Sequence, residues 1–313
     1  MLTRHEEIAA ALQLALLLEV SAYPKPGNVH RTRNFEATRF EHFLGSAAAL
    51  EPHFRLAALR GRRVAESMTP SPELAIGKRI KLAVQTCSEW QHGGNTSLGA
   101  ILLLTPIAYA AGMTSPKSPM RIQEIRRKLR EVVTRTTPAD AVNTYRAISY
   151  ASPGGLGKVP DLDVNDEDSI ASIRKRNLSL LDVFRMSSRY DTISREWAGN
   201  FSVTFDVGLP FLTKELRATG DINAAIVNTY LRILSRIPDT LIARKQGIEI
   251  AKEISLQASR VLRKGGMRVP SGRRAVEKMD ETLRRSDHRY NPGTTADLTA
   301  SALSVLILSG FRP

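Results

Sequence analysis

The chain has 313 residues, 42% of them hydrophobic, so it can bury a sizeable core in one domain or two. A single cysteine, Cys87, excludes an internal disulfide, and no apolar run reaches the roughly 20 residues that span a bilayer. With no signal-peptide pattern at the N-terminus, these features predict a cytoplasmic protein without a membrane segment. The net charge of +14 fits simple solubility, and it also fits an anionic metabolite or a nucleic acid as ligand.

Apolar residues recur at helical spacing along most of the chain, and the alternation that marks strands is nearly absent. Ser202–Val207 is the one weak strand candidate. Ser152–Asp168 is the longest irregular stretch, and a loop of that length is often a lid or a binding element. The sequence therefore predicts an all-α fold in which residues 1–313 form a single multi-helix domain with a long central loop. The predicted helices cover residues 5–22, 40–58, 73–90, 98–112, 119–134, 138–149, 170–186, 195–218, 221–236, 241–264, 272–285 and 294–309.

Two glycine-rich polar segments each lead directly into an apolar helix. The first is His92–Gly99, and the second is Tyr290–Asp297. Helix N-termini present unpaired N–H groups and partial positive charge, and glycine lets a ligand approach the backbone closely. A Ser or Thr N-cap explains such a helix start without a ligand. The cap does not account as well for the large number of glycines. In a chain of this charge, the two segments indicate a polyphosphate site.

Charged residues gather at other turns and helix ends. Lys25 stands between two prolines and could clamp a phosphate, although a helix-ending turn with exposed charges explains that segment more simply. Asp239 occupies a predicted N-cap position, with Arg244 five residues later, and Asp297 lies one turn into the last helix. Such aspartates can stabilise a helix start, hold Mg²⁺ against phosphates or take a proton from a hydroxyl. The residues alone leave these alternatives open.

Taken in order, these segments resemble the triphosphoribosyl-dephospho-CoA synthase family from about residue 8 to residue 310. The resemblance implies an all-α enzyme that displaces adenine from ATP and attaches the triphosphoribosyl group to the 2′ hydroxyl of dephospho-CoA. The chain has Ser97-Leu98 where the bacterial synthases carry His-Lys, and His30 where they have Asp. These departures leave open a related ribosyltransferase with a different hydroxyl acceptor. The segments that carry the resemblance are Pro24–Gly27, Ser46–Phe54, Asn95-Thr96 with Gly99, Asp239-Thr240, and Asn291–Gly293 with Ala296–Leu298.

The resemblance gives these residues expected roles. Asp239 and Asp297 are the predicted catalytic residues, as Mg²⁺ ligands or as general base, with Mg²⁺ bound together with the substrate ATP. The predicted substrate- and phosphate-binding residues are Lys25, Gly27, Asn95, Thr96, Gly99, Arg244, Asn291 and Gly293.

Two other classes of protein remain as alternatives. A basic all-α RNA-binding protein would explain the sequence pI of about 10.2, although no nucleic-acid motif is present. A hydrolase that cleaves the glycosidic bond of a nucleotide would use water in place of the acceptor. The oligomeric state is left open by the sequence.

Overall fold

The computed structural model describes residues 2–67, 73–115, 119–154, 161–164, 166–285 and 287–313. The prediction of an all-α fold is confirmed, and the described residues contain no strand. No helix among them is both long enough and apolar enough to cross a membrane. The cytoplasmic location stays a prediction. The α-helices are α1 Arg4–Ser21, α2 Phe40–Glu66, α3 Ile76–Trp90, α4 Leu98–Gly112, α5 Ile122–Thr134, α6 Pro138–Ala151, α7 Glu167–Lys175, α8 Leu180–Ser187, α9 Thr192–Ala198, α10 Leu209–Thr219, α11 Ile222–Arg236, α12 Thr240–Gln246, α13 Ile248–Arg263, α14 Pro270–Arg284 and α15 Gly293–Leu308.

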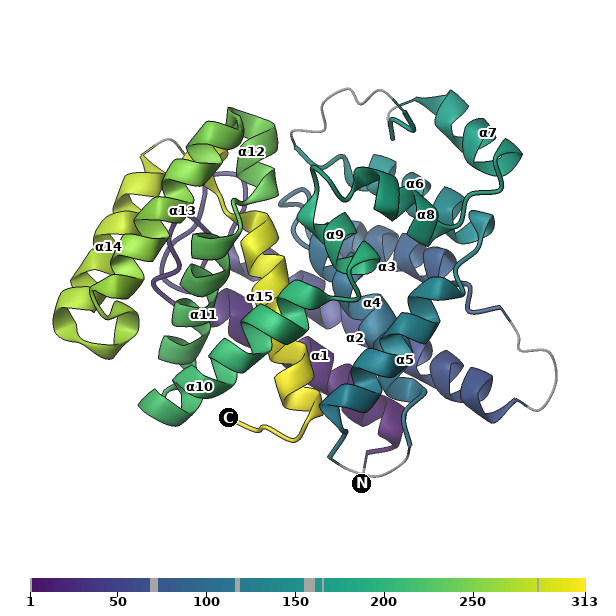
Figure 1. Cartoon of the computed structure of the whole chain (residues 1–313), viewed down its shortest axis with the longest axis horizontal. Helices are drawn as coiled ribbons and strands as arrows, with labels where there is room; N and C mark the ends of the chain where they lie inside the picture. The colour runs from purple at the N-terminus through teal and green to yellow at the C-terminus, as the bar shows by residue number, and fades with distance from the viewer. Residues whose placement is uncertain (1, 68–72, 116–118, 155–160, 165, 286) are drawn as a thin grey trace.

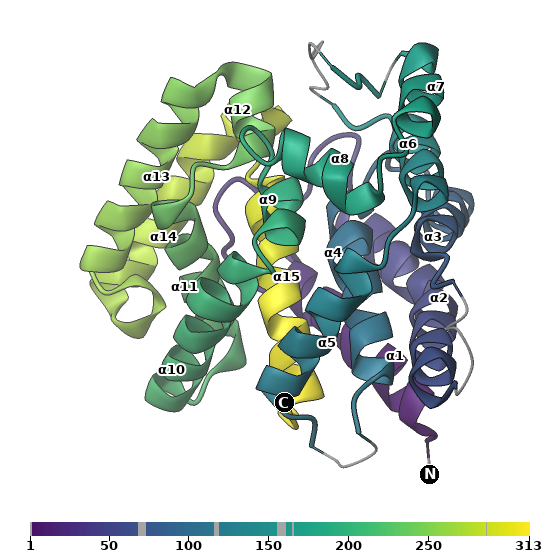
Figure 2. The ribbon, with the colours of Figure 1, turned by 45° about the vertical axis from the view of Figure 1, so that its right-hand side comes forward.

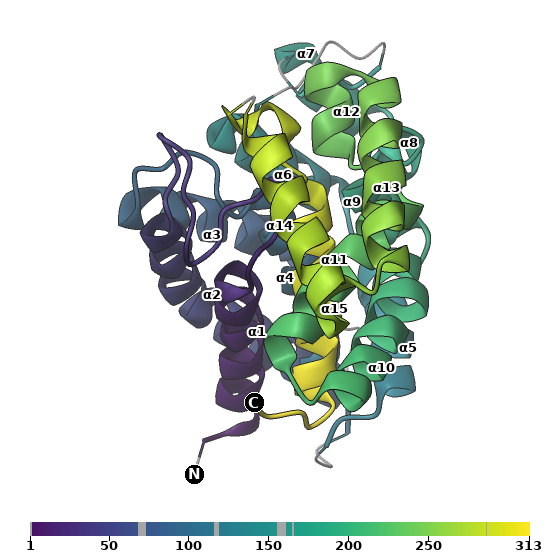
Figure 3. The ribbon, with the colours of Figure 1, turned by 90° about the vertical axis from the view of Figure 1, so that its left-hand side faces the viewer.

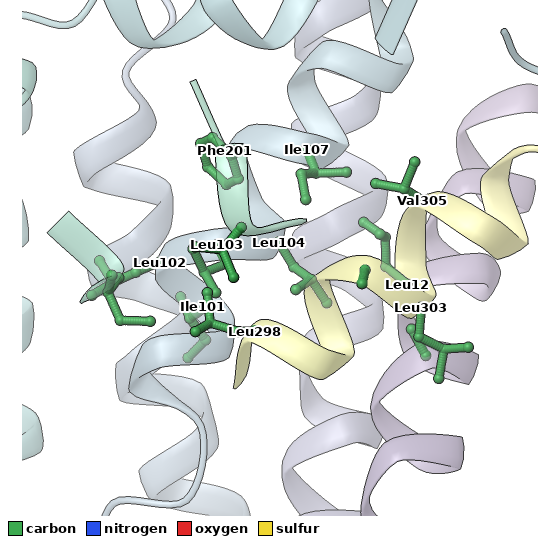
Figure 4. Packing of buried hydrophobic residues seen from close by; sticks show 14 of the residues in the cluster. Leu12, Ile101, Leu102, Leu103, Leu104, Ile107, Phe201, Leu298, Leu303 and Val305 are labelled. Atoms are coloured by element: carbon green, nitrogen blue, oxygen red, sulfur yellow. The ribbon is translucent and has the colours of Figure 1, made fainter. Parts of the chain in front are cut away.

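The last helix, α15, lies at the centre of the molecule. It contacts α1 and α4 on one side and α10 and α11 on the other (Figures 1 and 2). Nearly every residue of α4 and α15 is buried, which explains why both helices are apolar all round. Leu12, Leu103, Leu298 and Val305 meet where the three helices α1, α4 and α15 pack together (Figure 4).

Glycines allow α2 and α4 to pack closely. A Cβ at Gly61 would lie 2.1 Å from the carbonyl oxygen of Tyr109, and a Cβ at Gly112 would lie 2.0 Å from that of Ala58. The two helices therefore contact each other through backbone atoms, which fixes the position of α4 in the core.

Three predicted helices are interrupted in the structure, because the chain takes a left-handed or otherwise non-helical turn within each. Residues 170–186 divide at Asn177 (φ +51°), and residues 241–264 divide at Gly247 (φ +93°). Residues 195–218 divide at Asn200 and Phe201, both with positive φ. The strand suggested for Ser202–Val207 is wrong, because Val203–Gly208 forms a short π-helix that leads into α10.

The expected central loop, Ser152–Asp168, is irregular in most of the residues that the structure describes, but its last two residues, Glu167 and Asp168, belong to α7. Residues 152–154 and 161–164 belong to no helix, and residues 155–160 and 165 lie outside the described residues. The helix α7 begins at the end of this loop. Both chain termini lie at one end of the molecule, and α7 and α12 lie at the opposite end (Figure 3).

Candidate active site

A cavity of about 710 Å³ lies where α1 ends and where α4 and α15 begin. Its volume falls within the range of roughly 300–1,000 Å³ that is usual for small-molecule sites. One wall is polar and is formed by the glycine-rich segments, and the other is largely apolar and comes from α6, α8 and the central loop. The apolar wall includes Tyr145, Ile148, Leu162, Val164, Val183 and Phe184.

Hydrogen bonds of side chains inside and outside the first glycine-rich segment hold it in place. Gln91 accepts a hydrogen bond from the Gly93 N–H (2.6 Å) and donates one to the Gly94 carbonyl (2.8 Å). The Asn95 Oδ1 accepts from the Leu98 N–H (3.1 Å) and so caps α4. The Thr96 hydroxyl is hydrogen-bonded to Ser46 (2.7 Å). The N-terminus of α4 is thus fixed in position against the cavity.

Asp297 lies directly against this N-terminus. A Cβ at Gly99 would be 2.0 Å from the Asp297 Oδ2, so only glycine allows α4 and α15 to approach this closely. Burial, together with the charges of Glu19 and Asp239, raises the pKa of Asp297 well above its usual value. The Ala100 N–H and Lys25 oppose that shift. A carboxyl group is therefore held at the cavity wall in a setting that disfavours its charge.

A second carboxylate at the cavity, Glu19, was missed from the sequence. It lines the cavity from the last turn of α1, and its residue is only 7% exposed. The Lys25 Nζ donates to the Glu19 carboxylate and, at 3.0 Å, to the Glu19 carbonyl. The sequence did contain one signal for Glu19. A glutamate in the last turn of an apolar helix stands at the negative end of the helix dipole, where a negative charge is unfavourable.

The loop that follows α1 is tied to the start of α15. The Asn28 Nδ2 donates to the Asn291 Oδ1 (2.8 Å), and both residues line the cavity. The Gly27 N–H donates to Asp280 (2.9 Å), and Gly27 has a φ of +72°. A Cβ there would lie 2.7 Å from the Tyr290 carbonyl oxygen. Gly27 thus allows the loop after α1 to pack closely against the loop before α15. It does not line the cavity.

Asp239 connects α12 to α15. Its Oδ1 caps α12 by accepting from the Leu241 and Ile242 N–H groups (2.9 and 3.1 Å). Its Oδ2 accepts from the N–H and the hydroxyl of Thr295 (2.7 and 2.8 Å). Burial raises the pKa of Asp239, and the Thr295 hydrogen bonds are the largest opposing effect. Both oxygens therefore have protein partners, and Asp239 does not line the cavity.

Basic side chains reach the cavity from α12. Arg244 donates through Nη1 to the Asp191 Oδ1 (2.9 Å), and its Nε is buried with no hydrogen-bond partner. Lys245 also lines the cavity, next to Gly154 of the central loop. An unsatisfied guanidinium N–H is costly to bury, so Arg244 is held here at a cost in stability.

The structure brings most of the predicted site residues to this one cavity. Three of the predicted residues do not line the cavity but contact residues or helices that do: Lys25, Gly27 and Asp239. The predicted residues that line the cavity are Asn95, Thr96, Gly99, Arg244, Asn291, Gly293 and Asp297.

The sequence comparisons point to one family. Residues 5–312 match the family described as ATP:dephospho-CoA triphosphoribosyl transferase. The chain is 25% identical over 299 residues to 2-(5''-triphosphoribosyl)-3'-dephosphocoenzyme-A synthase from Klebsiella pneumoniae, covering 94% of this chain and 88% of that protein. It is 27% identical over 311 residues to a candidate synthase of the same name from Pseudomonas syringae pv. tomato, covering 98% and 92% of the two chains.

A solved structure supports the fold. The crystal structure of a candidate triphosphoribosyl-dephospho-coA synthase from Archaeoglobus fulgidus matches with a TM-score of 0.62 at 24% identity. The match covers 86% of this chain and 100% of that one. The chain therefore belongs to the ATP:dephospho-CoA triphosphoribosyl transferase family.

Proposed function

We propose that this protein transfers the triphosphoribosyl group of ATP to a hydroxyl of dephospho-CoA and releases adenine. The observation that carries the proposal is the meeting of two glycine-rich helix N-termini at one cavity, with Gly99 against the Asp297 carboxylate. Helix N-termini favour phosphates through their free N–H groups and partial positive charge. Family membership supplies the reaction class.

The chemistry of the two cavity walls suggests which part of ATP binds to each wall. We assign the triphosphate to the polar wall, which contains Asn95, Thr96 and the N–H groups near Gly99, and to Arg244, which lines the same cavity. Asn291 and Gly293, at the start of α15, are placed for contacts to phosphate or ribose. Adenine suits the apolar wall, where Tyr145 and Phe184 offer aromatic surface. Holding both substrates in one geometry would supply much of the rate.

Magnesium is proposed to enter with ATP. No group of three or more His, Cys, Asp or Glu side chains that could hold a metal occurs among the described residues. Mg²⁺ is commonly held by one or two carboxylates together with substrate phosphates, and Asp297 can supply such a carboxylate. Asp239 does not fit this role, because both of its oxygens are already hydrogen-bonded. The bound ion would neutralise charge on the triphosphate.

The first experiment is to measure adenine release from Mg²⁺-ATP by chromatography, with and without dephospho-CoA. Release that requires dephospho-CoA is expected. Release without any acceptor would instead support the hydrolase alternative, and no release under either condition would contradict the proposed donor or acceptor.

Two matched variants test the roles of the aspartates. Asp297→Asn should reduce turnover at least about 100-fold while thermal unfolding stays near that of the wild type, because its carboxylate faces the cavity. Asp239→Asn should lower the unfolding temperature, because an amide cannot accept all four hydrogen bonds. Near-wild-type turnover of the Asp297 variant would contradict its assignment.

A further inference from the structure

Glu19 and Lys25 form a buried ion pair at the back of the cavity, and only the glutamate reaches the cavity wall. The Glu19 side chain is 9% exposed and Lys25 is fully buried. Lys25 is the sole hydrogen-bond partner of the Glu19 carboxylate among the described residues, and it binds Oε1. The second carboxylate oxygen, Oε2, therefore has no protein donor and is available to a molecule in the cavity.

The position of Lys25 argues against direct contact with a phosphate. Its Nζ donates to the side chain and to the backbone carbonyl of the same residue, Glu19, and Lys25 does not line the cavity. To reach a phosphate, the ammonium group would have to leave a buried carboxylate unpaired, which is costly. The two hydrogen bonds instead fix the orientation of Glu19.

We propose that Glu19 is the general base that accepts the proton of the acceptor hydroxyl, and that Lys25 is the residue that positions it. This inference rests on the proposed function. In the step, the acceptor oxygen forms a bond to C1′ of the ribose while the bond from C1′ to adenine breaks, with its electron pair leaving on adenine. The hydroxyl proton passes to Glu19 Oε2 and is returned to the departing adenine, so that atoms and charge balance.

The charges around Glu19 and Asp297 favour this division of roles. Glu19 already has the Lys25 ammonium on one oxygen, and the positive charge of Lys25 weakens the attraction of this carboxylate for a second cation. Among the described residues, no cation is hydrogen-bonded to Asp297, so it is the better partner for the Mg²⁺ of ATP. Burial also raises the pKa of Glu19, which makes its carboxylate a better proton acceptor.

The test is a double-mutant cycle on Glu19→Gln, Lys25→Met and the double variant. Steady-state adenine release in the presence of dephospho-CoA gives kcat, and calorimetric titration with Mg²⁺-ATP alone gives Kd. We expect Glu19→Gln to lower kcat about 100-fold or more, as loss of a general base does. Lys25→Met should lower kcat about 10-fold or more, and the double variant should be no slower than Glu19→Gln, because Lys25 acts through Glu19. The Kd for Mg²⁺-ATP should stay within about 3-fold in all three.

A different pattern would overturn the inference. If Lys25 contacts the triphosphate, Lys25→Met should weaken Mg²⁺-ATP binding about 10-fold or more, and the losses in kcat/KM should multiply in the double variant. A Glu19→Gln variant with near-wild-type kcat would also overturn it. An inactive wild type would refute the proposed function as well, whereas an active wild type with an active Glu19→Gln variant would refute only this inference.

Glu215 offers a matched control, because it is a buried glutamate paired with a cation away from the cavity. It accepts hydrogen bonds from Arg268 (2.9 and 2.5 Å) and Asn228 (2.8 Å). Glu215→Gln should lower the unfolding temperature but keep kcat within about 2-fold. If Glu19→Gln alone does not fold, the double variant carries the test, since it removes both buried charges together. Its kcat should then still fall about 100-fold.

Discussion

The buried carboxylates of this protein differ in the number of hydrogen bonds that they accept from the protein. Glu196, Asp239 and Glu215 each accept at least three hydrogen bonds from the protein, so their role is to hold helices together. Glu19 and Asp297 face the cavity with few protein donors. Burying such groups costs stability unless a ligand satisfies them, and this cost marks them as functional candidates.

Glu196 makes stability depend on pH. Burial raises the pKa of Glu196 from its ordinary value of 4.5 to about 7, against the hydrogen bonds from Thr204 and Val203. Between these two values the folded state keeps a proton that the unfolded state has released. The free energy of unfolding is therefore expected to fall as pH rises from 4.5 to 7, by about 1–3 kcal/mol from this residue.

Urea unfolding at pH 5 and pH 8 measures this effect. Asp239, Asp297 and Glu19 also have raised pKa values, so the wild type must be compared with Glu196→Gln. The variant is expected to be less stable at both pH values and to show a smaller loss between them. Equal losses in the two proteins would mean that Glu196 does not titrate in this range.

The two ends of α4 provide a matched pair of glycine substitutions at the scale of the helix. At each end a Cβ would lie 2.0 Å from another atom, the Ala58 carbonyl oxygen for Gly112 and the Asp297 Oδ2 for Gly99. Gly112→Ala should lower the free energy of unfolding by about 1–3 kcal/mol and leave kcat nearly unchanged. Gly99→Ala should instead reduce kcat at least about 10-fold, because it displaces Asp297 from the N-terminus of α4.

Circular dichroism during urea unfolding and adenine release measure the two effects separately. The expected pattern is a loss of stability at one end of α4 and a loss of activity at the other. Activity lost equally in both variants would show that α4 acts as one rigid body and that its N-terminus has no special role.

The helices could be predicted from apolar periodicity, but their interruptions could not. The periodic pattern continues through Asn177, Asn200 and Gly247, so three sets of shorter elements were each predicted as a single helix. Asn and Gly adopt positive φ at low cost, but whether they do so is decided by tertiary contacts. The π-helix at Val203–Gly208 likewise depends on Glu196, which accepts from the N–H groups of Val203 and Thr204 (2.7 and 2.9 Å).

The site could be predicted in outline for a similar reason. Glycine-rich helix starts are visible in the sequence, and those at Asn95 and Asn291 do reach one cavity. Local sequence does not show which side of a helix start faces the ligand. Asp239 was therefore predicted as a catalytic residue, although its hydrogen bonds join α12 to α15. Glu19 was overlooked because it stands between three leucines and a valine.

On the scale of the whole molecule, the cavity does not share the strongly basic character of the chain. The chain carries a net charge of +14, yet Arg244 and Lys245 are the only Lys or Arg residues that line the cavity among the described residues. In the same described part of the chain, four acidic residues line it: Glu19, Asp163, Asp191 and Asp297. Most of the excess positive charge therefore lies elsewhere and can attract anionic substrates over a distance, whereas we expect binding in the cavity to depend on Arg244, backbone N–H groups and the proposed Mg²⁺.

This separation of charge also tests the RNA-binding alternative. If the basic surface binds RNA only through general attraction, the affinity measured by fluorescence anisotropy should fall about 10-fold or more between 50 and 200 mM salt. Asp297→Asn should leave that binding unchanged while it abolishes adenine release, because the cavity and the basic surface act independently. Tight RNA binding that persists at 200 mM salt and is lost in the Asp297 variant would place RNA in the cavity and contradict the proposed transferase site.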